Sequence, residues 1–343
     1  MQPGDAFRAY VPGSQITQPT GSDWKYNRRL VSDTMLPGFL DNVAAERVSD
    51  AMRDLVALWR EKMRLAPHHT FECREDLHFA TTDAIWAMTF GTEGLATCKE
   101  QTSHLASLSS IPLPTDIGKD LVVYPAKAPP PAFEAIKLLT HSSKIAIQFG
   151  YKIHAAVLNV VPRYRKARAT RDALVREKLV AAEKKFTAGA SQESKVTCAV
   201  DLVVQREIAT ATKENRKPMT PDMVSRIHNE LCLFLFAGAT TTADTLAWGL
   251  KELSLRQDYQ KKIRDHMKAA HPRIFEEGRQ PPANALGRPG NPYLEALMYE
   301  VMRRRPISCG HFRIATENTQ LLGHDIPKDT EIIFAVSGTD CSV

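Results

Sequence analysis

Residues 231–242 hold the arrangement with the strongest potential for chemistry. Six successive apolar residues, 231–236, predict a helix without a polar face, and such a helix belongs in a protein core. Gly238 and the three threonines that start at Thr240 then break the pattern, because glycine and β-branched residues are poor helix formers. A buried helix that departs from these rules at one point is a candidate for function. A structural alternative stays open, in which the threonines only bond back to carbonyls one turn earlier.

Glu300 and Arg303 form the second candidate, a carboxylate and a guanidinium at i and i+3 on one helix face. Taken alone, they fit an ordinary surface ion pair worth a few tenths of a kcal/mol. Their surroundings make the pair more informative. The helix ends in three arginines and Pro306, and a β-rich segment that carries Arg313 follows within ten residues.

The six cysteines indicate neither a zinc site nor a disulfide framework, because no two of them have a C-x-x-C spacing. Free thiols in a reducing compartment are therefore expected. The first residues are polar and no apolar run reaches membrane-spanning length, so we expect neither a signal peptide nor a transmembrane anchor. Apolar and charged contents of 43% and 24% are typical of a soluble globular protein. A net charge of +6 is a mild excess and does not indicate a nucleic-acid partner.

The length of 343 residues allows one large domain or two ordinary ones, and we expect a single domain over residues 1–343 because no segment has the character of a linker. Apolar periodicity predicts that it is mostly helical, with a little antiparallel sheet near its end. Its expected parts are an irregular lead-in (1–22), a helical body (23–305), and a short β-hairpin region with a tail (306–343). Within the body, residues 92–132 are rich in Ser, Thr and Pro, and we interpret them as a surface excursion.

Local signals refine this outline. Thr220 followed by Pro221 predicts the start of a helix over 221–255, with the threonine as its cap. Residues 311–315 and 331–336 are rich in β-formers and are predicted strands, with turns between them at 323–325 and 327–329.

A basic cluster lies at the start of a predicted charged helix over 164–186. We interpret it as a solvated face, and contact with a membrane surface is the alternative. A helical module that binds an anionic surface through this cluster is a minor hypothesis for the whole protein. The cluster consists of Arg163, Arg165, Lys166, Arg168 and Arg171.

Four motifs occur in a fixed order along the chain. They are Trp24-x-x-x-Arg28, Ala237-Gly238-x-x-Thr241-Thr242, Glu300-x-x-Arg303, and Arg313 followed by residues 326–330. Together they resemble a cytochrome P-450, a haem-thiolate monooxygenase, of the fungal type, and the resemblance runs over nearly the whole chain. It implies a mainly α, cytochrome P-450-like helical fold with a small antiparallel β region near the C-terminus, in incomplete form.

The resemblance implies roles for the threonine helix. Thr241 matches the threonine that holds water beside the iron-bound dioxygen and relays protons, which requires a hydroxyl that both donates and accepts. Gly238 would let the helix backbone approach the haem face. Thr240 stands where the family usually has Asp or Glu, so it cannot supply a titrating carboxylate. Asp244 could substitute for that acid, or it could only face solvent or a neighbouring helix.

The resemblance also implies roles for five charged or aromatic residues. Glu300 and Arg303 match the buried pair that locks the helix beneath the haem, and breaking such a pair costs about 3–5 kcal/mol. Trp24, Arg28 and Arg313 match residues that hold the haem propionates, a task that suits the forked arginine side chain.

Cofactors and partners follow from the same resemblance. They are haem iron, NADPH acting through a cytochrome P-450 reductase, and a hydrophobic small-molecule substrate, expected in fungal secondary-metabolite biosynthesis. The implied reaction is hydroxylation or epoxidation, in which one oxygen atom of dioxygen enters a C–H or C=C bond. The family is found at the endoplasmic reticulum membrane, whereas the lack of an apolar anchor run leads us to expect a cytoplasmic location for this chain.

The family's haem ligand lies in a Phe-x-x-Gly-x-Arg-x-Cys-x-Gly loop, and this sequence contains no such loop. Cys309 lacks the loop context, and Cys341 lacks the Phe, the Arg and the Gly spacing. The chain thus resembles the middle of the family fold, truncated at both ends, with no metal ligand assigned. We expect it to bind haem poorly, and the alternative function is a non-catalytic remnant without the haem-ligand cysteine.

Overall fold

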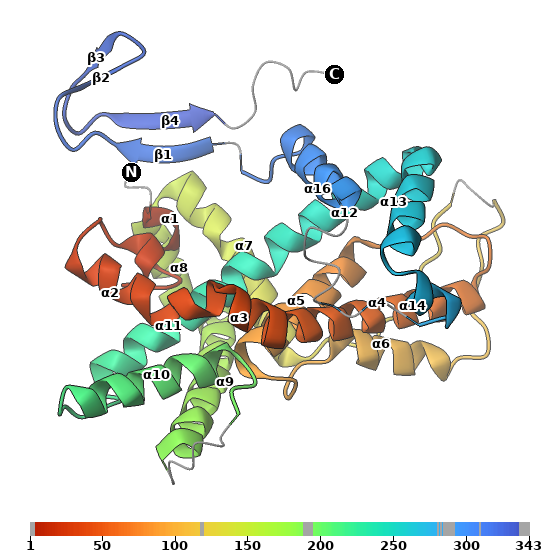
Figure 1. Cartoon of the computed structure of the whole chain (residues 1–343), viewed down its shortest axis with the longest axis horizontal. Coiled ribbons are helices and arrows are strands. Elements are labelled where there is room, and N and C mark those ends of the chain that lie inside the picture. The colour runs from red at the N-terminus through yellow and green to blue at the C-terminus, as the bar shows by residue number, and fades with distance from the viewer. Residues whose placement is uncertain are drawn as a thin grey trace.

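The computed structural model describes residues 4–116, 120–187, 195–279, 281, 283, 292–308 and 310–335. They form a mostly helical body with two small sheets beside it (Figure 1). The helices are α1 (Asp5–Arg8), α2 (Ser22–Val31), α3 (Pro37–Phe39), α4 (Ala45–Leu65), α5 (Arg74–Phe90), α6 (Thr97–Ala106), α7 (Pro131–Phe149), α8 (Tyr151–Val160), α9 (Pro162–Thr187), α10 (Ala199–Lys213), α11 (Pro221–Gly238), α12 (Thr240–Leu255), α13 (Gln257–Ala270), α14 (Pro272–Glu276) and α16 (Pro292–Arg304). Two 3₁₀ turns (Gln15–Thr17 and Ser32–Met35) and a π turn (Leu40–Ala44) connect some of them.

Helix α5 lies at the centre of the body and packs against α4, α6, α10, α11 and α12. It is buried on nearly every side, and Leu77 and Trp86 are each only 1% exposed. Burial of one such large side chain stabilises the fold by about 1.5–3 kcal/mol. The Trp86 indole N–H still finds a partner, the backbone carbonyl of Glu93 at 2.9 Å. The junction of α11 and α12 packs against this helix.

Helix α11 begins as the sequence predicts. The Thr220 hydroxyl accepts a hydrogen bond from the backbone N–H of Met223 at 3.3 Å, and Pro221 takes the first helical position. Residues 231–235 are buried, as expected for an apolar core helix. The single helix predicted over 221–255 is instead two, because the helix is interrupted at Ala239 and α12 starts at Thr240. The interruption falls at the point where the sequence departs from helix-forming rules.

The stretch Pro221–Leu255 is long and apolar enough to cross a membrane by length and composition. The expectation that no apolar run reaches that length was therefore wrong. Much of its first half is nevertheless packed inside the fold, and Leu231 and Leu235 are fully buried.

The predicted strands are confirmed as β1 (Gly310–Ile314) and β4 (Glu331–Ala335), which pair antiparallel with Arg313 opposite Ile332. A second hairpin, β2 (Thr319–Leu321) and β3 (His324–Ile326), was not predicted. Only Leu322 and Gly323 form its turn, both with positive φ (53° and 81°), as a tight two-residue hairpin loop requires. The expected turn at 323–325 was therefore wrong for its last two residues, which belong to β3.

Two segments expected to be irregular contain helices. The lead-in 1–22 includes α1 and a 3₁₀ turn, and its Tyr10 and Val11 are buried in the core. The supposed surface excursion 92–132 includes α6, whose Cys98 and Leu105 are also buried. In both segments only some of the apolar residues are buried, and overall polarity does not indicate which ones.

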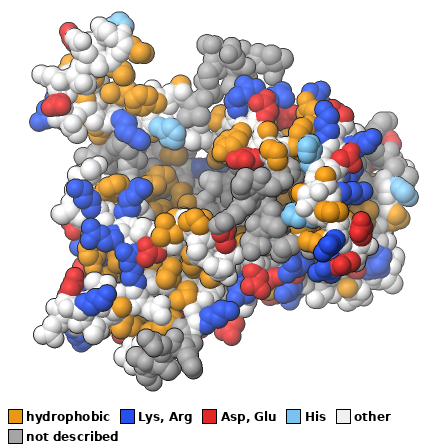
Figure 2. All heavy atoms as spheres, in the orientation of Figure 1, with side chains coloured by type: hydrophobic (Ala, Val, Ile, Leu, Met, Phe, Trp, Pro, Cys, Tyr) orange, Lys and Arg blue, Asp and Glu red, His pale blue; other side chains and the backbone are white. Residues whose placement is uncertain are grey.

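The basic cluster at the start of α9 was only partly interpreted correctly. Arg163, Arg165 and Lys166 are exposed and Arg168 is half-buried, whereas Arg171 is only 4% exposed. Its guanidinium carbon lies 4.7 Å from the centre of the Tyr10 ring, so Arg171 belongs to the interior. Figure 2 shows basic, acidic and apolar side chains mixed over one face of the molecule, without a single basic field.

Candidate functional site

The junction of α11 and α12 is the first part of the candidate site. A Cβ atom on Gly238 would lie 2.6 Å from both Cγ1 and Cδ1 of Ile85 on α5. No side chain therefore fits at this position unless Ile85 moves. The close approach seen here is between α11 and α5, and the proposed approach to a haem face stays a prediction.

Thr241 bonds back along the helix, as the structural alternative anticipated. Its hydroxyl donates to the Ala237 carbonyl at 2.5 Å, and the Thr245 hydroxyl donates to the Thr241 carbonyl at 2.9 Å. The side chains of Ala237 and Thr241 are nevertheless exposed. A hydroxyl that donates a hydrogen bond keeps two lone pairs, so Thr241 Oγ1 can still accept a hydrogen bond from a molecule on this face.

Thr240 and Asp244 complete the polar side of α12. Thr240 is the first residue of the helix and is half-buried. Asp244 accepts a hydrogen bond from Arg74 of α5 at 3.0 Å, with its side chain 27% exposed. Of the two alternatives for Asp244, the structure places it against a neighbouring helix in an ion pair.

Trp24 and Arg28 lie together on α2. The guanidinium carbon of Arg28 is 5.3 Å from the centre of the Trp24 ring, which is a cation–π contact. Arg28 is exposed and Trp24 is half-buried. The i,i+4 spacing therefore brings the two side chains together on one face, as the motif requires.

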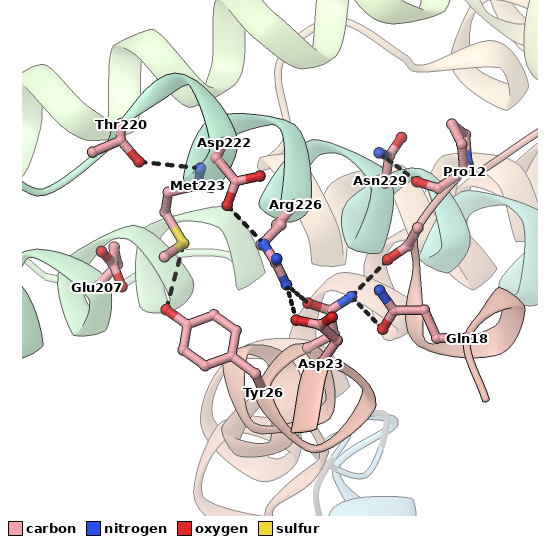
Figure 3. Close-up of polar contacts among 12 residues, drawn as sticks. Pro12, Gln18, Asp23, Tyr26, Glu207, Thr220, Asp222, Met223, Arg226 and Asn229 are labelled. Atoms are coloured by element: carbon pink, nitrogen blue, oxygen red, sulfur yellow. Dashed lines mark hydrogen bonds and ion pairs between the residues drawn. The ribbon is translucent and has the colours of Figure 1, made fainter. Parts of the chain in front are cut away.

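Contacts with α11 hold α2 in position (Figure 3). Arg226 of α11 lies 3.3 Å from the Asp23 carboxylate, and the Tyr26 hydroxyl lies 3.9 Å from the Met223 sulfur. Since α11 also leads to Gly238, these contacts fix Trp24 and Arg28 on the same framework as the threonines.

Glu300 and Arg303 form the predicted ion pair on α16, with two hydrogen bonds of 2.7 and 2.8 Å. These hydrogen bonds hold the pKa of Glu300 below its usual range. The expectation that the pair is buried was wrong, because the two side chains are 51% and 60% exposed. Helix α16 packs on α12 and α13, and the ion pair lies on its solvent-facing side.

Arg313 lies on β1 and is exposed, and it donates to the backbone carbonyl of Phe312 at 2.8 Å. In the part of the chain that the structure describes, no hydrogen bond or ion pair joins Arg313 to Trp24 or Arg28. Of the three residues predicted to hold the haem propionates, two therefore lie together on α2, and the third, Arg313, lies separately on β1.

A haem-thiolate site needs a cysteine thiolate, and the described cysteines do not fit that role. Burial raises the pKa of the thiols of Cys73, Cys98 and Cys198, which disfavours their thiolate forms. Cys232 is fully buried on α11, beside His228. Cys309 and Cys341 lie outside the described residues. The described cysteines thus do not fit the thiolate side of a haem site, and the oxygen-side role of Gly238 and Thr241 stays a prediction.

Two surface hollows lie elsewhere. One of about 460 Å³ is bounded by residues of the β2–β3 hairpin such as Gln320 and Asp325. The other, of about 520 Å³, runs along α9 beside Arg176 and Lys184. Neither includes a predicted site residue, so neither carries a role for the threonine helix.

A largely buried polar cluster of Asp172, His228 and Cys232 lies between α9 and α11 and was not predicted. Although burial opposes its charged form, hydrogen bonds with Asp172 and Cys232 raise the pKa of His228 to about 10. Burial also opposes the carboxylate of Asp172, yet its hydrogen bond with His228 and the charge of Arg171 lower its pKa to about 2. The signal available in the sequence was the i,i+4 spacing of His228 and Cys232.

Comparisons with known proteins agree on one family. The family model for cytochrome P450 matches residues 2–340. The cytochrome P450 monooxygenase GME11363 of Pestalotiopsis microspora is 33% identical, over 98% of this chain and 58% of that protein. The cytochrome P450 monooxygenase TRI13 of Fusarium sporotrichioides is 30% identical, over 96% and 57%.

Solved structures show the same fold. A cytochrome P450, CYP102L1, superposes with a TM-score of 0.69 at 13% identity, covering 98% of this chain and 65% of that one. Retinoic acid-bound cyanobacterial CYP120A1 gives 0.62 at 16% identity, covering 98% and 61%. The chain spans less than two thirds of each of these proteins. The predicted mainly α fold is confirmed, and the chain belongs to the cytochrome P450 family, which carries haem iron and draws electrons from nicotinamide cofactors through a reductase.

Proposed function

We propose that the protein is a haem-dependent monooxygenase that hydroxylates or epoxidises a hydrophobic small molecule in fungal secondary metabolism. The observation that carries the proposal is the interrupted helix with an exposed, oriented Thr241 hydroxyl one turn from Ala237. The proposed role in secondary metabolism is supported by a relative in Dothistroma septosporum. That protein is named as a cluster cytochrome P450 monooxygenase and is 31% identical over 49% of this chain.

The chain's own residues have defined tasks in this proposal. When bound, haem supplies the iron that activates dioxygen. The Thr241 hydroxyl donates its hydrogen bond to the Ala237 carbonyl, which leaves the lone pairs of the Thr241 oxygen to accept a hydrogen bond from a water molecule. Because Thr240 has no titrating carboxylate, protons reach Thr241 through water alone.

Charged residues at the edges of the site are proposed to orient the cofactor. Trp24, Arg28 and Arg313 would hold the haem propionates, since an arginine fork can bond a carboxylate in two places. Exposure of Arg28 and Arg313 supports this role, because both guanidiniums can reach a ligand. None of the described cysteines is proposed as the haem thiolate, since the thiols of Cys73, Cys98 and Cys198 favour the protonated form and Cys232 faces α9.

The test begins with the transcript across the codons for residues 336–343. Its longest open reading frame is then expressed with an NADPH-dependent cytochrome P450 reductase. We expect oxidation of hydrophobic substrates that needs NADPH, dioxygen and the reductase together. A product that forms without dioxygen would contradict the proposal. An open reading frame without a Phe-x-x-Gly-x-Arg-x-Cys loop would favour the non-catalytic remnant.

A further inference from the structure

Three donors of different chemistry meet between α9 and α11. The Asp172 carboxylate oxygen Oδ1 lies 3.4 Å from His228 Nε2, and the Cys232 sulfur lies 3.9 Å from the same nitrogen. All three ligand atoms lie within 4.8 Å of one another. His228 and Cys232 stand one turn apart on α11, and Asp172 reaches them from α9.

The cluster is largely buried. Cys232 is fully buried, and the side chains of His228 and Asp172 are 16% and 31% exposed. The Tyr10 ring packs on Arg171, the neighbour of Asp172 on α9. A partly open cluster of this kind leaves a path by which an ion can enter from solvent.

The spacing fits the requirements of a small transition-metal ion. Zinc binds Cys, His and Asp in a tetrahedral arrangement at about 2.0–2.3 Å, which separates its ligand atoms by about 3.3–3.6 Å. The distance from His228 to Asp172 already matches, and the distance from His228 to Cys232 needs to shorten by only a few tenths of an ångström. The separation of Asp172 and Cys232 needs to close by at most about 1 Å.

We propose that Asp172, His228 and Cys232 bind one divalent transition-metal ion of the zinc class, which fastens α9 to α11. Water takes the fourth coordination position. Arg171 holds the same oxygen, Asp172 Oδ1, through Nε at 2.8 Å and Nη2 at 2.6 Å. On metal binding, Arg171 keeps one of these contacts, since a carboxylate can accept from a guanidinium and bind a metal at the same time. This site is independent of haem and of the proposed oxidation.

Charge and protons balance in this assignment. The metal replaces the thiol proton of Cys232 and any proton on the bound nitrogen of His228, and these protons leave to solvent. No electron is transferred. Two positive charges on the ion and one on Arg171 then face the thiolate and the Asp172 carboxylate, which leaves one net positive charge in the cluster. Burying the ion, the guanidinium, the thiolate and the carboxylate together is far less costly than burying any one of them alone, because most of their charge is neutralised.

The test titrates cobalt(II), a spectroscopic substitute for zinc, into the metal-free 343-residue chain. We expect a thiolate-to-cobalt charge-transfer band that saturates at one ion per chain and disappears when zinc is added. Cys232→Ser should abolish the band, and His228→Gln should weaken binding more than about tenfold. Cys198→Ser is the matched control, because Cys198 is also buried but belongs to no group of three possible metal ligands among the described residues, and it should keep the band.

Three results would overturn the proposal. They are the absence of a thiolate band in the unmodified chain, an unchanged band in Cys232→Ser, and loss of binding when His68 and His69, an adjacent pair on an exposed turn, are replaced instead. Zinc content gives a second measurement that does not depend on how the variants fold. The unmodified chain purified from zinc-supplied cells should hold close to one equivalent, and a value near zero contradicts the site.

Discussion

Gly238 and Thr241 lie three residues apart at the junction of α11 and α12, and each makes a contact that a small substitution changes. Gly238 lacks the side chain that would strike Ile85, and Thr241 combines a bond to Ala237 with an exposed oxygen. The requirement at Gly238 is therefore steric and the requirement at Thr241 is chemical, so each can be tested by its own substitution.

Replacing Gly238 by alanine should destabilise the protein by about 1–3 kcal/mol, because the new methyl group overpacks the contact with Ile85. Gly249 in α12 is the matched control, since a Cβ there meets nothing within 4 Å. Gly249→Ala should stabilise the helix by about 0.5–1 kcal/mol. Denaturant unfolding measures both, and equal effects of the same sign would contradict the packing account.

Replacing Thr241 by valine keeps the shape and removes the hydroxyl. If Thr241 relays protons, the rate of product formation in the reductase-coupled reaction should fall on the order of 10²-fold. Thr245→Val is the control, because Thr245 makes the same back-bond one turn later. Equal losses in the two variants would mean that the hydroxyls have only a structural role.

At the scale of elements, α4 and α5 are joined by a buried ion pair. Lys62 Nζ lies 2.6 and 2.8 Å from the two oxygens of Asp76, and the Trp59 indole donates to the same carboxylate at 2.9 Å. The side chains of Lys62 and Asp76 are 10% and 5% exposed. Burial raises the pKa of Asp76, while Lys62 and Trp59 lower it. Since α5 supports the candidate site, this pair also supports the site.

Replacing Lys62 by methionine should cost about 3–5 kcal/mol near neutral pH, because Asp76 is left as a buried, uncompensated carboxylate. A raised folded-state pKa means that the folded protein holds the proton more tightly than the unfolded chain does. The loss should therefore shrink as the pH falls through the folded-state pKa of Asp76. Unfolding curves at several pH values test this, and a loss that does not change with pH would refute it. Glu300→Gln, on the exposed pair of α16, should leave the unfolding midpoint unchanged.

How far the sequence predicted these elements depended on the kind of signal. Local rules predicted the Thr220 cap, the buried apolar run of α11 and the strands β1 and β4, and all of these predictions were confirmed. Burial was harder to predict, because it depends on distant partners. Arg171 is buried because the Tyr10 ring, 161 residues away in sequence, covers it.

The candidate site was predictable to a similar degree. Spacing placed Trp24 beside Arg28 and Glu300 beside Arg303, since both pairs lie within one helix. Spacing could not place Arg313 relative to α2, because that relation depends on how a sheet docks on the helical body. Nor could it reveal that Asp172 meets His228, since α9 and α11 meet only in the folded chain.

At the scale of the whole molecule, hydrogen bonds join the lead-in segment to helix α11 of the helical body. The backbone N–H and side-chain amide of Gln15 both donate to the buried Glu230 carboxylate, at 2.7 and 3.0 Å. The Asn229 amide donates to the Pro12 carbonyl at 2.8 Å (Figure 3). These contacts fasten residues 12–15 to α11, so one connected framework carries the N-terminal segment, α2 and the threonine junction.

We propose as the central claim that this framework would form the oxygen side of a cytochrome P450 site, while none of its described cysteines fits the role of the thiolate. The most direct test is the absorption spectrum of the purified 343-residue chain, reconstituted with haem, reduced and exposed to carbon monoxide. We expect a spectrum without the band of a haem-thiolate protein. A normal haem-thiolate band that is lost on replacing Cys73, Cys98, Cys198 or Cys232 by serine would contradict the claim.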